Sequence, residues 1–166
     1  MSLKQKIKDD VKEAMKQKNQ ELVDVLRMTL SSISTKEKEK RYQIAKEDPA
    51  KTEEDLNKES EFSDEEILTA ITSEVKKRKD AIALYEQGGR PELADSEKKE
   101  IAILMTYLPE QISADELKKL VQESIEKTGA KEIKDTGKIM ADLMPQVKGK
   151  ADNGEISKII KELLAK

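Results

Sequence analysis

A glycine–lysine pair at a predicted helix start provides the clearest phosphate-binding chemistry in this sequence. Gly137 and Lys138 fall in the first turn of a helix that Asp135 or Thr136 would cap. The first N–H groups of a helix have no partner within it, and the helix dipole places positive charge there. Such a start favours an anion, and a lysine beside it adds a full charge. We therefore name Gly137 and Lys138 as candidate phosphate contacts.

A second glycine–lysine cluster follows further along the chain. Gly149 is the residue type that commonly ends helices, and Lys148 and Lys150 flank it. Asp152 and Glu155 then have the spacing of a capping box, which predicts another helix start. We expect the two helix starts and their lysines to meet in one corner of the fold, where they would bind phosphates.

Residue sets typical of catalysis and metal binding are missing from the sequence. The chain has no cysteine and no histidine, so it lacks thiolate nucleophiles and the commonest metal ligand and general base. Lys138 is not preceded by the glycine-rich frame of a P-loop. Because no nucleophile, base and orienting group share a recognisable spacing, we assign no catalytic residue, metal site or cofactor.

One arginine falls on the apolar row of a predicted helix. Arg78 should therefore point inward, where a guanidinium without a carboxylate partner is strongly destabilising. Glu74 lies one turn earlier and Glu100 lies on the next helix, which predicts a structural ion pair with either carboxylate. The alternative is an anion-binding group formed by Arg78, Arg90 and Arg27. We favour the structural pair.

Amphipathic helices account for nearly all of the apolar pattern. Hydrophobic residues make up 36% of the chain and aromatic residues 2%, so the core must be aliphatic. Apolar spacings of three and four, capping boxes and glycine stops recur along the sequence. The pattern predicts an all-α protein, with an N-terminal antiparallel helical bundle over residues 1–108. A small three-helix C-terminal domain over residues 109–166 follows it.

The segment from Lys36 to Glu61 interrupts this pattern, because it is rich in charge and poor in apolar residues, and we place its loop at about residues 41–61. We expect a helix extension followed by a charged, mobile loop near Pro49. A docking or regulatory segment is the alternative.

Charge and hydropathy limit the partners and the location. The formal net charge is −3, which argues against broad, nonspecific nucleic-acid binding, and we expect no DNA partner. From Gly129 to Lys166, eight lysines face six acidic residues, so a small basic patch remains open. No apolar run approaches the roughly 20 residues needed to span a bilayer. No signal region follows the first lysines, so we expect a soluble, cytoplasmic protein without a membrane partner.

Several short motifs, in order along the chain, resemble the GatB/YqeY family. The resemblance covers nearly the whole chain, and full-length YqeY-like proteins are more similar to it than the GatB tail domain is. Its motifs are Leu26-Arg27-Met28, Lys77-Arg78-Lys79-Asp80, Tyr85 with Gly89-Arg90, Tyr107-Leu108-Pro109-Glu110-Gln111, and the two glycine–lysine clusters. The sequence departs from the family pattern between Lys36 and Glu61, where it is longer.

The resemblance implies a function linked to tRNA. GatB belongs to tRNA-dependent amidotransferases, which are carbon–nitrogen ligases with glutamine as amide donor, and its tail domain contacts tRNA. The kinase-like catalytic region of GatB has no counterpart here, so amidotransfer is not expected of this polypeptide alone. By position, the residues expected to contact RNA are Gly137, Lys138, Lys148, Gly149 and Lys150.

The expected partners follow from the same resemblance. They are tRNA, and amidotransferase subunits or other translation-related proteins. The alternative function is a protein–protein interaction adaptor that does not bind RNA. Such an adaptor would use a face of the bundle or the charged segment, and would show no salt-sensitive RNA binding.

Overall fold

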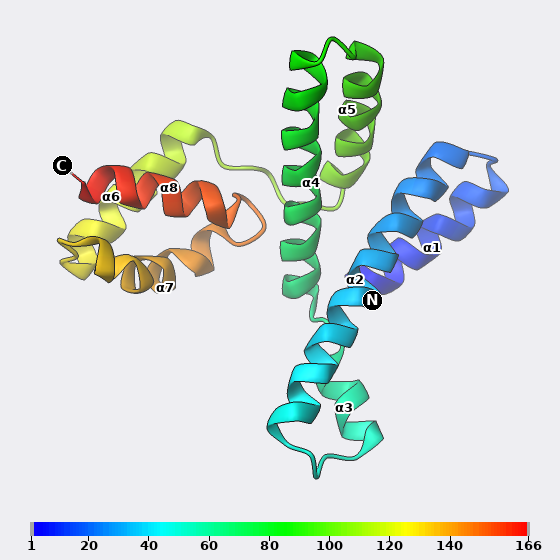
Figure 1. Ribbon diagram of the computed structural model, residues 1–166, viewed down its shortest axis with the longest axis horizontal. Coiled ribbons are helices and arrows are strands. Elements are labelled where there is room, and N and C mark those ends of the chain that lie inside the picture. Colours follow the sequence, from blue (N-terminus) through cyan, green and yellow to red (C-terminus); the bar gives the residue numbers. More distant parts are fainter. Residues whose placement is uncertain (1, 166) are drawn as a thin grey trace. The chain divides into compact units, whose positions relative to one another are not determined.

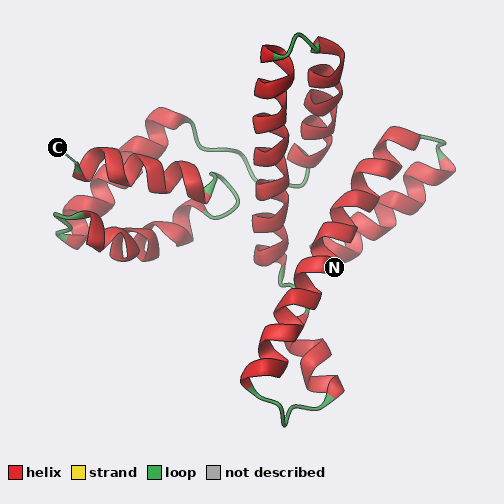
Figure 2. Cartoon of the chain, viewed as in Figure 1, coloured by secondary structure: helices red, strands yellow, loops and turns green. Residues whose placement is uncertain are grey.

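The computed structural model describes residues 2–165, and within this range the chain contains eight α-helices and one short 3-10 turn (Figure 2). No strand occurs in the described residues, which confirms the all-α prediction. The chain divides into two compact units, Met1–Tyr107 and Leu108–Lys166.

The first unit consists of two helical hairpins and a short additional helix (Figure 1). Its helices are α1 (Leu3–Lys16), α2 (Gln20–Glu47), α3 (Glu53–Ser60), α4 (Asp64–Gln87) and α5 (Pro91–Met105). Helix α1 packs antiparallel on α2, and α4 on α5, while α2 also contacts α3, α4 and α5. The buried side chains are aliphatic and include Ile7, Leu26, Ile33, Ile67, Ile71 and Leu104.

The boundaries of α4 follow from local sequence chemistry. The Ser63 hydroxyl accepts the N–H of Glu66 at 3.3 Å, and the Glu66 carboxylate accepts the N–H of Ser63 at 2.8 Å. This reciprocal pair is the capping box that the sequence predicts. At the other end, Gly89 adopts a left-handed φ of 67°, which lets the chain reverse into Pro91 at the start of α5.

The expected helix extension and a loop at Pro49 are both present, but the loop is much shorter than the predicted residues 41–61. Helix α2 continues to Glu47, and α3 forms from Glu53 to Ser60, which leaves residues 48–52 as the connection. The Thr52 hydroxyl caps α3 by accepting the N–H of Asp55 at 3.2 Å. Leu56, only 7% exposed, anchors the short helix, which packs on α2. A good cap, one buried apolar residue and the contacts of Arg41 with Glu53 and Asn57 hold this helix where sequence periodicity is too weak to predict it.

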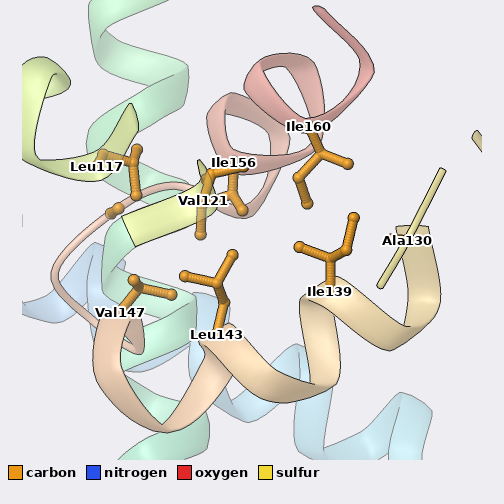
Figure 3. Packing of buried hydrophobic residues seen from close by; sticks show 9 residues of the cluster. Leu117, Val121, Ala130, Ile139, Leu143, Val147, Ile156 and Ile160 are labelled. Atoms are coloured by element: carbon orange, nitrogen blue, oxygen red, sulfur yellow. The ribbon is translucent and has the colours of Figure 1, made fainter. Parts of the chain in front are cut away.

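The second unit is a three-helix arrangement around one small aliphatic core. It contains α6 (Ala114–Thr128), the turn η1 (Ile133–Asp135), α7 (Thr136–Val147) and α8 (Asn153–Leu164). Figure 3 shows side chains of all three helices facing one another. They are Leu117 and Val121 of α6, Ile139, Leu143 and Val147 of α7, and Ile156 and Ile160 of α8.

Across residues 2–165, no helix is both long enough and apolar enough to cross a lipid bilayer.

Candidate functional site

The two glycine–lysine clusters lie at opposite ends of one helix. Gly137 is in the first turn of α7, and Lys148 follows the last residue of α7. Because an α-helix rises about 1.5 Å per residue, the two clusters are roughly 16 Å apart along the axis. The prediction that they meet in one corner is therefore wrong. Pro145 lies inside α7 near its end, and the helix continues past it to Val147.

The start of α7 already contains a carboxylate. Asp135 occupies the cap position, but its side chain does not cap α7. Instead it accepts the N–H groups of Lys131 and Glu132 at 3.2 and 3.3 Å, and the ammonium of Lys138 at 3.0 Å. The hydrogen bond from Lys138, followed by those from the backbone, lowers the pKa of Asp135. The cation predicted to bind phosphate is thus paired within the protein.

Gly137 leaves the backbone at this helix start accessible. The residue is exposed, and a methyl group built at its Cα would meet no atom within 4 Å. A phosphate could approach this backbone more closely than it could approach a residue with a side chain.

The second cluster forms a tight turn that is tied to the start of the unit. Gly149 is buried and has a φ of 74°. Its carbonyl accepts a hydrogen bond from the Gln111 side chain at 2.8 Å, and the carbonyl of Lys150 accepts the N–H of Ile112 at 3.0 Å. Gly149 therefore has a conformational role here, while the side chain of Lys150 is exposed and that of Lys148 is half-buried.

Helix α8 begins directly after this turn. The carboxylate of Asp152 accepts the N–H of Glu155 at 3.0 Å, which confirms the predicted cap. Because this cap is itself anionic, it competes with any external anion for the positive end of the helix. At both helix starts, phosphate binding would therefore depend on lysine side chains more than on the helix termini.

Gln111 is a residue whose role sequence reasoning missed. Its amide donates to the carbonyls of Pro109 and Gly149, at 2.9 and 2.8 Å, and so holds the α7–α8 turn against the segment before α6. The only sequence signal was its position in the motif from Tyr107 to Gln111, and a motif alone does not identify the atoms that an amide will bind.

The first unit contains a separate, largely structural cluster around Arg78. The arginine side chain is 8% exposed, and its guanidinium lies 3.1 Å from Glu74 and 3.0 Å from Glu100. Glu97 lies further away, at 3.8 Å. The Ser32 hydroxyl of α2 donates to Glu74 at 3.1 Å, so the cluster connects α2, α4 and α5.

The remaining arginines of the alternative anion-binding group have other neighbours. Arg90 pairs with Glu92 at 2.6 Å, and Arg27 lies beside the sulfur of Met15 at 3.5 Å. Among the described residues, neither arginine contacts the glutamates that surround Arg78. A pocket of about 240 Å³ opens beside Arg78, lined in part by Met28 and Ala81.

Glu74 is held in its ionised form by this cluster. Partial burial acts to raise the pKa of Glu74, but Lys77, Arg78 and Ser32 together act more strongly in the other direction. The net effect is a pKa below the ordinary value of 4.5. The described part of the chain presents no group of three or more acidic side chains placed to hold a metal ion.

A family profile described as Yqey-like protein matches residues 48–164. The chain belongs to the YqeY-like protein family. The match includes both glycine–lysine clusters, Gln111 and the Arg78 ion pairs, whereas α1 and α2 precede it. A search of curated proteins finds no match.

Within this YqeY-like region, the α7–α8 turn is the best candidate for contact with an anionic polymer. Lys148 and Lys150 flank Gly149 there, and Lys138 lies one helix length away. Lysines this far apart suit a ligand with repeated negative charges better than a small anion, which would need convergent donors.

Proposed function

We propose that the chain is a tRNA-associated accessory protein that contacts the RNA backbone through lysines of its second unit. The observation that carries this proposal is the construction of the α7–α8 turn. Its carbonyl oxygens at Gly149 and Lys150 are bonded to Gln111 and Ile112, while the Lys150 ammonium remains exposed. The exposed Lys150 ammonium therefore extends from a turn whose backbone is fixed.

Lys138 supplies a second, separate contact in this proposal. Its side chain is 70% exposed, whereas the Asp135 side chain that it pairs with is 15% exposed. Asp135 also accepts the N–H groups of Lys131 and Glu132, so its carboxylate keeps two hydrogen bonds when an RNA phosphate takes the lysine. Two contact points roughly 16 Å apart along α7 fit two different phosphates of one RNA backbone.

Family relations support tRNA as the class of RNA. The chain is a YqeY-like protein, and its tail resembles the tRNA-contacting tail of GatB. We assign no catalytic step to its residues, and amidotransfer with glutamine remains the activity of the larger GatB-containing enzymes. The proposed role is binding, alone or beside a translation-related protein.

The test is equilibrium binding of tRNA by the full chain and a triple variant at low salt. The substitutions are Lys138→Gln, Lys148→Gln and Lys150→Gln. Each loses a charge but leaves the cap at Asp152 and the glycine turn in place. The proposal predicts a loss of affinity of at least tenfold, because each phosphate contact contributes through counterion release.

A matched control removes the same charge from the first unit. Lys8, Lys79 and Lys99 are exposed, and among the described residues none of them has an acidic partner. Their triple replacement by Gln should leave tRNA binding within about twofold of the parent, since a remote charge acts only through the screened long-range field. Equal losses in both triple variants, or no binding by the parent, would favour the adaptor function instead.

A further inference from the structure

The outer face of α2 carries a tyrosine between two lysines at helical spacing. Lys38, Tyr42 and Lys46 are four residues apart, so their side chains lie in one row on the helix surface. Tyr42 is 67% exposed, and both lysines are exposed. The row lies opposite the buried side of α2, where Ile33 is fully buried. Packing of the first unit therefore does not account for it.

The two lysines of this row differ from their basic neighbours. Lys40 binds Glu66 of α4 at 2.7 Å, and Arg41 pairs with Glu53 of α3. In residues 2–165, neither Lys38 nor Lys46 forms an ion pair or hydrogen bond through its side chain. Their charges remain available to an external anion.

The neighbours of Tyr42 indicate what kind of partner fits. A helix that docks into a protein groove presents apolar residues three, four and seven positions apart. Around Tyr42, the positions three and four residues away hold Lys38, Glu39, Ala45 and Lys46. This face has one aromatic ring and no apolar row. Glu39 borders it, and Lys38 also lines a pocket with Glu37 and Glu61, of which Glu37 is paired with Lys4 at 2.6 Å.

We propose that the Lys38–Tyr42–Lys46 row binds single-stranded RNA, with a base stacked on the Tyr42 ring and phosphates on both lysines. Stacking on an exposed aromatic ring tolerates any base, and flanking lysines follow the backbone on either side. The row is a surface of the first unit, and its binding does not depend on the lysines of the second unit.

The absence of tryptophan from the chain allows a direct test of stacking. Tyr42→Trp places a single fluorophore in the row and keeps an aromatic ring there. Titration with poly(U), a single strand with little structure of its own, at about 20 mM salt should quench this fluorescence, because low salt leaves phosphate contacts unscreened. Leu84→Trp is the matched control, since Leu84 is 68% exposed and has Asp80 and Gly88 four residues away.

The lysines are tested in the Tyr42→Trp background. Replacing Lys38 and Lys46 by Gln should weaken poly(U) binding at least fivefold, and should reduce the salt slope by about 1.4 units for two single-strand contacts. If poly(U) fails to quench the Tyr42→Trp variant, or quenches the Leu84→Trp control equally, the proposal is overturned. Quenching that the lysine replacements leave unchanged would overturn it as well.

One further variant separates this surface from the proposed tRNA contacts. Tyr42→Trp combined with Gln at Lys138, Lys148 and Lys150 should retain quenching by poly(U). If quenching persists and tRNA affinity is unchanged, the proposed tRNA contacts are contradicted but the binding of single-stranded RNA by the row is not. Loss of poly(U) quenching in this combined variant would show that the row does not bind by itself.

Discussion

Arg78 of α4 and Glu100 of α5 lie 3.0 Å apart, Nη2 to Oε2, with the arginine side chain 8% exposed. The same guanidinium reaches Glu74 one turn earlier on α4. Glu74 shares α4 with Arg78, so Glu100 and the more distant Glu97 carry the contact across to α5. The Arg78–Glu100 pair therefore joins the two helices at a largely buried position, where loss of either partner is destabilising.

Removal of the arginine should therefore destabilise the first unit. Arg78→Ala leaves Glu74 and Glu100 without their guanidinium partner, and should lower the free energy of unfolding by about 2–4 kcal/mol. Arg27→Ala, at an exposed position of α2, should cost under about 1 kcal/mol. Urea denaturation followed by circular dichroism measures both. Similar small effects would contradict a structural role for Arg78.

The ionisation of Glu74 should make stability depend on pH. Its folded pKa lies below 4.5, so the unfolded chain binds the proton more readily. The resulting stabilisation is present above the unfolded pKa and is lost as the pH falls through the folded pKa. Below about pH 4.5, Glu74→Gln should therefore show a shallower decline of unfolding free energy than the parent. Glu39→Gln, at an exposed carboxylate with no ion pair among the described residues, is the control and should keep the parent's slope.

Two glycines of the second unit should respond to alanine in opposite directions. Gly137 is helical with free space around it, so Gly137→Ala should stabilise by about 0.5–1 kcal/mol. Gly149 has a φ of 74°, so Gly149→Ala should destabilise by about 1–2 kcal/mol. Thermal unfolding distinguishes them. A stabilising Gly149→Ala would show that the turn does not require a left-handed residue.

Helix α3 should depend on its single buried leucine. Leu56→Ala should lower stability by roughly 2 kcal/mol, because a buried leucine is truncated at an edge that can partly relax. It should also speed proteolysis between residues 48 and 61. Lys58→Ala, on the exposed side of the same helix, is the control. Equal proteolysis of parent and Leu56→Ala would mean that α3 is not held on α2 by this residue.

Local sequence chemistry was sufficient where one residue binds its near neighbours. Ser63 and Glu66, and Asp152 before α8, form the caps that their spacing predicts. The helical periodicity likewise predicted the all-α class. The partners in these interactions lie only a few residues apart, so a short stretch of sequence is enough to identify them.

Features that depend on longer distances were not predictable from these patterns. The sequence led us to expect Gly137 and Lys150 in one corner of the fold, but the length of α7 holds them apart. The Asp135 carboxylate could cap α7 or bind the backbone of the residues before it. It accepts the N–H groups of Lys131 and Glu132 and pairs with Lys138. Leu56 stands alone among charged residues, so its burial depends on the surface that α2 offers it.

The salt dependence of tRNA binding tests the central proposal most directly. The logarithm of the association constant is measured against the logarithm of salt concentration for three proteins: the parent, the triple Gln variant at Lys138, Lys148 and Lys150, and the control triple variant in the first unit. The proposal predicts a slope about two to three units smaller for the second-unit variant, roughly 0.7–0.9 per lost phosphate contact. The control should keep the parent's slope. Identical slopes for all three proteins would contradict RNA contact through these lysines.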